Sequence, residues 1–257
     1  MRKTTPGDPD PSALKRSSTY VAPALEKGFN VIELLARHPA GLMASEIAAG
    51  LGLTMSEIFR IIVVMERRRW LSKGPDDKYR VTPMVLELVF RATPSEELTA
   101  VAAPLMREFA AATDQSCHLV VRNGDTGLII MRQHNPGATG FYVRIGTSLN
   151  LATTCSGHVL LAFQTEMAQA EGWSKGLRAQ LNAVRARGFE RMESARTLGV
   201  TDISYPVFGF RGEAVAALTV PFLKVIDGTE LVGLDEAQAQ LGDTAHKISV
   251  ALGGKMP

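Results

Sequence analysis

The sequence has very little cysteine. Cys117 and Cys155 are the only two cysteines in the 257-residue chain. Two cysteines are too few for a disulfide framework, and they do not form a Cys-x-x-Cys motif of the zinc or thioredoxin type. We therefore predict no disulfide, no metal site and no cofactor.

Long apolar runs are also missing. The densest run, Ile61–Met65, is far shorter than the ~18 residues that span a bilayer. Residues 1–18 contain four prolines and glycines among charges and lack the apolar core of a signal peptide, so we expect a disordered tail. With 46% hydrophobic and 21% charged residues, the composition is that of a globular protein. We expect a cytoplasmic protein with no membrane partner.

Neither sign of charge is in large excess. The net charge is +2, and residues 1–90 hold 13 lysines and arginines against 10 aspartates and glutamates. So small an excess does not by itself indicate nucleic-acid binding. If DNA is the partner, the contact must come from a local basic cluster.

The length suits two modest domains, and the first third of the chain is rich in helix patterns. The spacing predicts helices over residues 23–38, 44–51 and from a Thr54-to-Glu57 capping box to near Arg69. The apolar stripe predicted for the first helix comprises Leu25, Phe29, Ile32, Leu35 and Ala36. Gly52 separates the second helix from the third, which is typical of a helix-turn-helix unit.

A hairpin and a further helix follow. Residues 70–73 and 78–82 alternate apolar and polar side chains around a turn-rich Gly74-Pro75-Asp76-Asp77 tip. The pattern therefore predicts a winged helix over residues 19–82. Met84 to Arg91 indicates a linker helix within residues 83–93, which Thr93-Pro94 breaks.

Residues 94–257 are expected to form an α+β domain with a mostly antiparallel sheet. The pattern predicts helices over residues 96–113, 156–164 and 233–252. It predicts strands over residues 117–122, 126–133, 141–145, 203–207 and 214–220. The Asn123-Gly124-Asp125 turn between the first two strands is a strong hairpin signal.

The third helix carries the residues suited to DNA. If Ile58 and Met65 lie in its core stripe, Ser56 and Arg60 share the opposite face. An arginine there can donate two hydrogen bonds to guanine, and Glu57 can accept one from cytosine, although the capping box already employs that carboxylate. A solvated helix face is the alternative. Phosphate contacts are expected from the Arg67-Arg68-Arg69 run and from Lys73, Lys78 and Arg80 of the hairpin.

Several short blocks, in order, together resemble one family. They are Ala24-Leu25, Ser45-Glu46-Ile47-Ala48, Gly52-Leu53, Ser56 to Ile62, Tyr79-Arg80-Val81, Gly146-Thr147, Cys155-Ser156-Gly157 before Leu160-Leu161-Ala162, Arg187-Gly188-Phe189, Ser204 to Val207 and Ala216 to Thr219. This arrangement, over residues 18–253, is similar to the IclR family of bacterial transcription regulators. The chain departs from the family pattern at Glu57, Thr82, His158 and the segment after Glu193.

The resemblance implies an N-terminal winged helix, a linker helix used in dimerisation, and a C-terminal effector domain of GAF-like fold. It implies a repressor, less often an activator, of a catabolic operon, binding a pseudo-palindromic operator as a homodimer or a dimer of dimers. The DNA-binding residues expected on this basis are Ser45, Thr54, Met55, Ser56, Glu57, Phe59, Arg60, Lys73, Lys78 and Arg80.

An effector site is expected where Cys155, Ser156 and Gly157 precede a helix, because free amides at a helix N-terminus favour a carboxylate or phosphate. A small organic acid is the natural ligand. By resemblance, Glu193, Asp202 and Thr219 complete the polar lining, with Phe141 and Val143 as the apolar wall. The alternatives are a purely structural Thr219, an Asp202 that only turns the chain, and a Cys155 that only packs.

Two other functions stay open at this point. An enzyme would use Ser156 with His158 or His118 and with Asp125 or Asp202, but the chain lacks the Gly-x-Ser-x-Gly elbow and no spacing requires these residues to meet. We therefore predict no catalytic residues. A ligand-independent architectural DNA binder is the other alternative, although such a protein needs no sizeable α+β domain.

Overall fold

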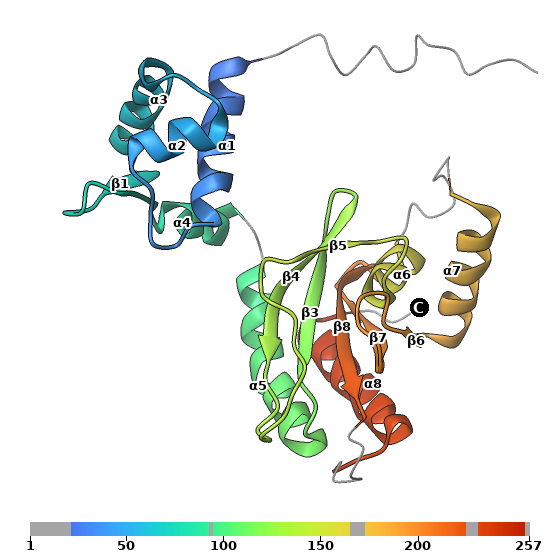
Figure 1. Cartoon of the computed structure of the whole chain (residues 1–257). Coiled ribbons are helices and arrows are strands. Elements are labelled where there is room, and N and C mark those ends of the chain that lie inside the picture. The colour runs from blue at the N-terminus through green and yellow to red at the C-terminus, as the bar shows by residue number, and fades with distance from the viewer. Residues whose placement is uncertain (1–21, 93–94, 165–172, 225–230, 255–257) are drawn as a thin grey trace, which may run out of the picture. The chain divides into compact units, whose positions relative to one another are not determined.

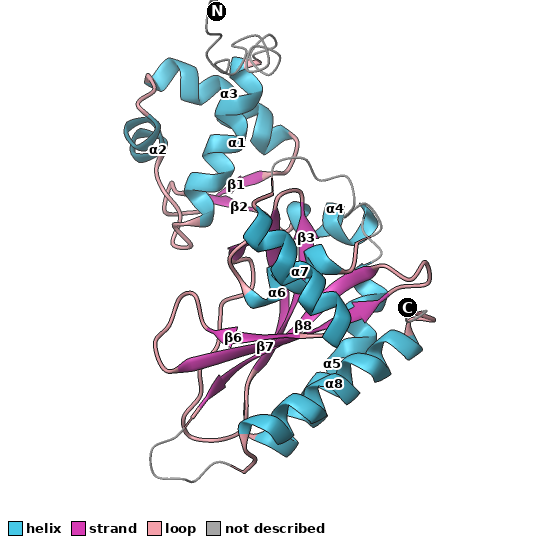
Figure 2. Cartoon of the chain, turned by 90° about the vertical axis from the view of Figure 1, so that its right-hand side faces the viewer, coloured by secondary structure: helices cyan, strands magenta, loops and turns pink. Residues whose placement is uncertain are grey.

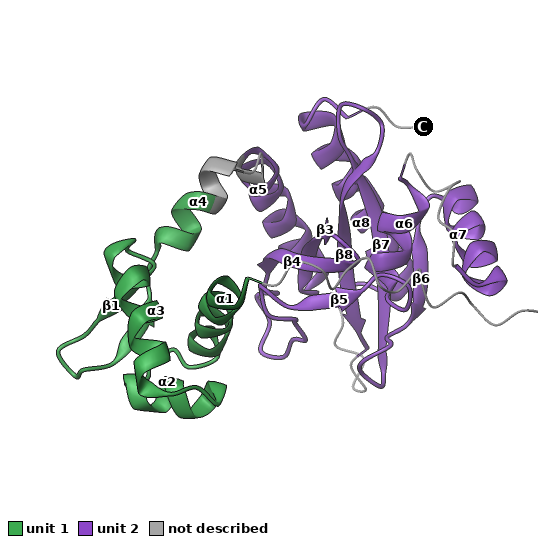
Figure 3. Ribbon diagram, turned by 90° about the horizontal axis from the view of Figure 1, so that it is seen from above, with its two compact units in different colours: residues 1–93 green, residues 94–257 purple. Residues whose placement is uncertain are grey.

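The computed structural model describes residues 22–92, 95–164, 173–224 and 231–254. The chain divides into two compact units, Met1–Thr93 and Pro94–Pro257 (Figure 3). The tail expected over residues 1–18 and the expected break at Thr93-Pro94 lie outside the described residues.

The first unit contains four helices and a small hairpin among its described residues (Figure 1). The elements are α1 (Pro23–Ala36), α2 (Ala44–Leu51), α3 (Met55–Arg67), β1 (Leu71–Lys73), β2 (Tyr79–Val81) and α4 (Met84–Ala92). The axes of α2 and α3 differ by 116° across a turn in which Gly52 adopts a left-handed φ of 63°. The antiparallel pair β1–β2 follows. The winged helix-turn-helix prediction is confirmed.

The core of this unit draws on all three leading helices and the hairpin. Val31, Ile47, Ile58 and Ile62 are fully buried, and Leu71 of β1 joins them. The stripe predicted for the first helix is wrong at three positions, because Leu25 and Phe29 are 59% and 53% exposed and Ala36 is also exposed. Leu25 and Phe29 lie in the first two turns, where α1 has no buried residue, and Ala36 is the last residue of the helix.

The second unit is built on a six-stranded antiparallel sheet in the order β5-β4-β3-β8-β7-β6 (Figure 2). Its strands are β3 (Cys117–Asn123), β4 (Thr126–Gln133), β5 (Ser148–Asn150), β6 (Glu190–Glu193), β7 (Val200–Phe208) and β8 (Ala214–Leu223). Its helices are α5 (Ser95–Thr113), α6 (Cys155–Ala162), α7 (Lys175–Arg187) and α8 (Leu234–Ala251). The expected α+β class with an antiparallel sheet is confirmed.

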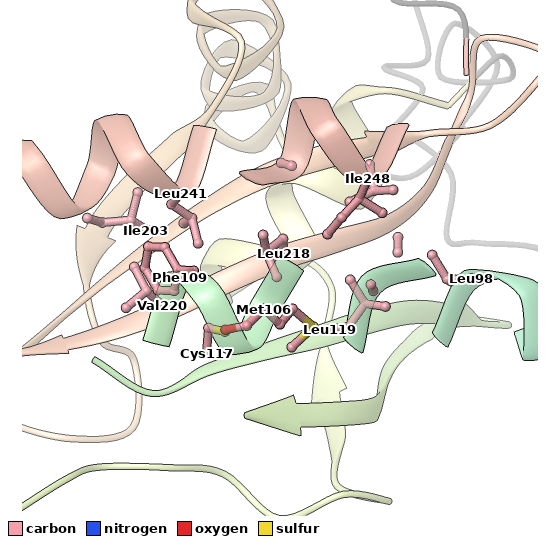
Figure 4. Close-up of a cluster of buried hydrophobic side chains, with 14 residues drawn as sticks. Leu98, Met106, Phe109, Cys117, Leu119, Ile203, Leu218, Val220, Leu241 and Ile248 are labelled. Atoms are coloured by element: carbon pink, nitrogen blue, oxygen red, sulfur yellow. The ribbon is translucent and has the colours of Figure 1, made fainter. Parts of the chain in front are cut away.

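Helices cover both faces of the sheet. Helices α5 and α8 lie side by side on one face, over a core that includes Leu119 and Leu218 (Figures 2 and 4). Helices α6 and α7 lie on the other face, over Val120 and Ala217. Because successive strand residues point to opposite faces, the central strands β3 and β8 supply both cores.

One predicted strand is wrong and three elements, β5, β6 and α7, were not predicted. Residues 141–145 form no strand; the chain joins the sheet only after Gly146, whose left-handed φ of 83° makes a turn that leads into β5. The prediction missed α7 because only Leu181 and Val184 of that polar helix are buried. It missed β6 because that strand has four residues at the sheet edge.

No single described helix is long and apolar enough to cross a membrane; α2 and α3 reach that length and composition only as a sharply bent pair. Among the same residues, no three histidine, cysteine or carboxylate side chains cluster as metal ligands. Cys117 and Cys155 are both buried free thiols.

Candidate functional site

The start of α3 is held by the predicted capping box. The Thr54 hydroxyl accepts a hydrogen bond from the Glu57 amide at 3.3 Å, and the Thr54 amide donates to Glu57 Oε2 at 3.0 Å. Lys27 of α1 donates to Glu57 Oε1 at 2.7 Å. The Lys27 ammonium, helped by Thr54, lowers the pKa of Glu57 to about 2. Both Glu57 oxygens therefore hold α3 in place, which leaves this side chain poorly suited to reading a base.

The outer face of α3 is open. Ser56 and Arg60 are exposed there, and Arg60 Nε donates to the Ser56 carbonyl at 3.2 Å. The terminal guanidinium nitrogens of Arg60 have no partner among the described residues. Met55 and Phe59 are 50% and 57% exposed beside them. Ser45 is exposed in the first turn of α2.

The hairpin is less cationic than its sequence indicates. Lys73 Nζ lies 2.6 Å from Asp77 Oδ1. Arg80 donates from Nη1 to Asp76 Oδ1 at 3.0 Å and from Nη2 to the Ala40 carbonyl at 2.7 Å. Lys78 is the one predicted hairpin cation without a described ion pair. It is therefore the best-placed hairpin cation for a phosphate.

The second unit contains a cavity of about 350 Å³ on the α6 face of the sheet. Its floor comes from neighbouring strands, with His118 of β3 paired in register with Thr219 of β8 and Asp202 on β7. The loops that enclose it are residues 141–147 and 194–197. The lining residues are His118, Phe141, Tyr142, Val143, Arg144, Thr147, Leu149, Thr154, Cys155, Ser156, Ser194, Ala195, Arg196, Thr197, Asp202 and Thr219.

The N-terminus of α6 opens into this cavity without a side-chain cap. The Thr154 hydroxyl donates to the Asn150 carbonyl at 2.6 Å instead of capping the helix. The first helical bond runs from the His158 amide to the Thr154 carbonyl at 2.9 Å. The amides of Cys155, Ser156 and Gly157 therefore have no acceptor among the described residues, and such a helix end favours an anion.

The charges around the cavity favour an anion at its mouth. Arg144 and Arg196 line the cavity, and neither has an acidic partner among the described residues. Burial lowers the pKa of His118 to about 4, so its imidazole is neutral at pH 7. Burial, together with the charge of Glu193, raises the pKa of Asp202, although a hydrogen bond from Ser194 acts to lower it. Burial likewise raises the pKa of the Cys155 thiol, which indicates a packing role and not a reactive one.

Six of the eight residues predicted for the effector site line this cavity, namely Phe141, Val143, Cys155, Ser156, Asp202 and Thr219. Gly157 does not; a Cβ there would lie 2.3 Å from the Leu151 carbonyl oxygen, so this glycine permits close packing. Glu193 is exposed at the end of β6, outside the lining.

His118, Arg144 and Arg196 line the cavity but were not predicted for the effector site. Strand alternation would have placed His118 opposite Cys117 and Leu119, but no local signal marks the two loop arginines.

His158 is not arranged to act as a base for Ser156. His158 Nδ1 lies 3.0 Å from Glu190 Oε2, and its Nε2 lies 3.0 Å from the Ala152 carbonyl oxygen. Both ring nitrogens are therefore occupied away from Ser156. Glu190, which is fully buried, also accepts from Gln180 at 2.6 Å and from Arg187. This polar cluster joins α6, α7 and β6 behind the cavity.

The chain matches two family models. One is the IclR helix-turn-helix domain, over residues 24–75. The other is the C-terminal domain of the bacterial transcriptional regulator IclR, over residues 90–250.

Named regulators align over most of the chain. The transcriptional regulator KdgR of Escherichia coli is 27% identical over 81% of this chain and 85% of its own. The transcriptional repressor AllR of Salmonella typhimurium is 23% identical over 100% of this chain and 97% of its own.

Solved structures share the fold. The IclR regulator of Alicyclobacillus acidocaldarius has a TM-score of 0.69 at 23% identity, covering 91% of this chain and 100% of its own. An IclR homolog from Microbacterium hydrocarbonoxydans, solved in complex with 4-hydroxybenzoate, has a TM-score of 0.74 at 22% identity, covering 89% and 98%. With both units matched in order, this chain belongs to the IclR family, whose members are transcriptional regulators and not enzymes.

Proposed function

We propose that this protein is a ligand-responsive repressor of a catabolic operon. It binds a pseudo-palindromic operator through α3 and the β1–β2 hairpin, and it binds a small organic acid in the cavity beside α6. Its target is chromosomal DNA, so we expect it in the cytoplasm. The observation that carries the proposal is the uncapped α6 N-terminus, where Cys155 and Ser156 line a cavity that Arg144 and Arg196 also line.

The effector we propose is a carboxylate. A carboxylate group would suit the N-terminus of α6 at Ser156 and the guanidinium groups of Arg144 and Arg196. The hydrocarbon part of the effector would contact the apolar wall formed by Phe141 and Val143. Asp202 and Thr219, on the floor, are placed to bond a hydroxyl or keto group. The 4-hydroxybenzoate bound by the homolog from Microbacterium hydrocarbonoxydans supports this chemical class.

The oligomer we propose is a homodimer or a dimer of dimers. Leu86 and Leu88 of α4 are 58% and 41% exposed, and Leu25 and Phe29 of α1 are exposed to a similar degree. A second copy that covers these side chains would pair two α3 helices for two operator half-sites. Effector binding would then favour a dimer whose half-site spacing differs from that of the free protein, and the affinity for DNA would change.

A carboxylate screen with matched neutral controls tests the cavity. The melting temperature of the full chain would be measured against a panel of aliphatic and aromatic carboxylates, each paired with its primary amide. We expect at least one acid to raise it, because a ligand at 100 times its Kd stabilises the native state by about 2.7 kcal/mol. The paired amide should leave it unchanged.

The site is checked with two variants. Ser156→Trp fills the cavity and should abolish the shift, whereas Leu198→Ala, at a fully exposed position outside the lining, should retain it. An architectural DNA binder would show no shift with any acid. A shift that survives in Ser156→Trp would place the ligand elsewhere.

A further inference from the structure

The exposed side of α3 carries two parallel rows of side chains. The polar row comprises Ser56, Arg60 and Arg67. The apolar row comprises Met55, Phe59 and Val63, which are four residues apart and 50%, 57% and 44% exposed. Residues four apart lie one above the other on a helix, so Met55, Phe59 and Val63 form a continuous row, and Ser56 lies one turn from Arg60. Arg67 lies seven residues after Arg60, two turns further along the same side.

The apolar row is not explained by packing within the unit. The core side of α3 is already filled by Ile58, Ile62 and Met65, which are buried. Three large apolar side chains that remain half exposed in one line mark a surface that contacts a partner. The charges beside the row describe that partner, because Arg60 and Arg67 have no acidic partner among the described residues.

Duplex DNA is the partner that fits both rows. In the major groove thymine alone presents a methyl group, and guanine presents two acceptors that suit a bidentate arginine. Both rows are exposed, and residues near the start of a recognition helix contact base edges. Met55 and Phe59 lie in the first two turns of α3, and Arg60 is adjacent to Phe59.

We propose that Phe59 and Met55 read thymine methyl groups next to a guanine that Arg60 reads. The inference rests on the proposed operator binding and makes it specific: each half-site contains a guanine flanked by thymine. Ser56, one turn before Arg60 in the polar row, contacts phosphate or a base edge. Glu57 takes no part in base reading, because Thr54 and Lys27 occupy its carboxylate.

The test begins with selection of DNA by the full-length protein from a pool of random duplexes. Each thymine of an enriched duplex is then replaced by deoxyuridine, which removes only the methyl group. We expect wild-type affinity to fall about fourfold at one or two positions in each half-site, the factor that corresponds to burying one methyl group. This step alters only the DNA, so it does not depend on how a variant folds.

Variants then assign the methyl contacts. Phe59→Ala should bind the thymine and deoxyuridine duplexes equally at one of these positions, and Met55→Ala should do so at another. Phe210→Ala, which removes an aromatic ring that is 69% exposed in the second unit, should keep the fourfold difference at both positions. Phe59→Leu retains an apolar group and should keep part of it.

The possible failures are distinct. If duplexes are enriched but no deoxyuridine substitution lowers the affinity, the thymine inference is overturned while operator binding stands. The same holds if Phe59→Ala shows the same affinity differences as wild type. Either result would favour a protein as the partner of the apolar row. A protein that enriches no duplex from the pool would overturn the proposed function as well.

Discussion

At the residue scale, the two kinds of cation in the first unit are expected to do different work. Arg60 has free terminal nitrogens over the middle of α3, whereas Lys78 stands on the hairpin without an ion pair among the described residues. A bidentate contact to a base carries sequence information, and a contact to phosphate does not. Removing the Arg60 side chain should therefore weaken binding to some DNA sequences more than to others, whereas removing the Lys78 side chain should weaken binding to all of them equally.

Replacing Arg60 by alanine should cost about 1 to 3 kcal/mol of operator binding and relax one base position. Gel-shift titration on duplexes enriched from a random pool would measure it. Lys78→Ala is the matched control, because it should weaken binding to all duplexes alike and reduce the slope of affinity against salt by about one. An unchanged affinity for Arg60→Ala would remove α3 from base reading.

Glu190 is the residue whose replacement should most disturb the second unit. Its carboxylate is fully buried and accepts hydrogen bonds from His158, Gln180, Arg187 and the Arg191 amide. Burial alone would raise its pKa, but these donors outweigh burial and the pKa is lowered. The group is therefore ionised in the native state at neutral pH.

Glu190→Gln should destabilise the second unit by about 3 kcal/mol, because a buried amide replaces a charged acceptor while its donors remain. Calorimetry of the full chain should show a melting temperature lower by about 6 to 12 °C. Glu193→Gln makes the same chemical change at the exposed end of the same strand and should have little effect. Equal losses for both variants would contradict the structural role of the buried cluster.

At the element scale, α3 is tied to α1 by Lys27 and Glu57. The lowered pKa of Glu57, about 2 against an ordinary value of 4.5, means that the ionised form is favoured in the folded state. The stabilisation is complete above pH 4.5 and is lost as the pH falls through the folded-state value near 2. The orientation of α3 thus depends on the ionised carboxylate of Glu57.

Glu57→Gln should be less stable than wild type above pH 4.5, and the difference should shrink as the pH falls towards 2. Urea unfolding of the full chain, followed by circular dichroism at a series of pH values, would measure this. Glu66→Gln, on the same helix and outside this contact, is the control. A constant difference at every pH would mean that ionisation of Glu57 does not stabilise α3.

Elements with strong local signals were predictable from sequence, and those defined by their neighbours were not. Helix α2 begins and ends as predicted because Gly52 terminates it by backbone preference alone. By contrast, Phe141, Val143 and Ile145 alternate like a strand, yet alternation arises equally in an extended loop that places Phe141 and Val143 against a cavity. The predicted stripe of α1 failed at Leu25 and Phe29 because apolar spacing does not distinguish a core from an uncovered surface.

The lining of the candidate pocket could likewise be predicted only in part from the sequence. Cys155 and Ser156 are marked by their place before a helix, and Thr219 and Asp202 by neighbouring strands. Arg144 and Arg196 could not be predicted from the sequence. They are exposed residues of separate loops with no local pattern, and only the fold brings them to the same cavity. The ion pairs of Lys73 with Asp77 and of Arg80 with Asp76 were not predicted, because they form only once the hairpin folds.

At the scale of the whole molecule, two compact units with separate cores should respond separately to their partners. A carboxylate effector should raise the transition of the second unit, and an enriched operator duplex should raise that of the first, since each stabilises only the unit that it binds. Calorimetry with each ligand alone and with both together would resolve the two effects. A random duplex of equal length is the control for the operator.

The combined experiment also measures coupling. If the effector releases the operator, the increase in melting temperature that the duplex gives should be smaller when the effector is present, as linkage requires. Additive shifts would show two independent binding units and would contradict a ligand-responsive repressor.

The cavity wall has two structurally different halves. His118, Thr219 and Asp202 stand on strands that also build the opposite core, so exchanging them risks the fold. Residues 141–144, Thr147 and residues 194–197 line the same cavity from two loops outside the strands. For anyone adapting this scaffold as a biosensor, diversity belongs in those two loops at positions other than Arg144 and Arg196, so that a library can change what is detected while the two arginines and the N-terminus of α6 keep the proposed carboxylate contact.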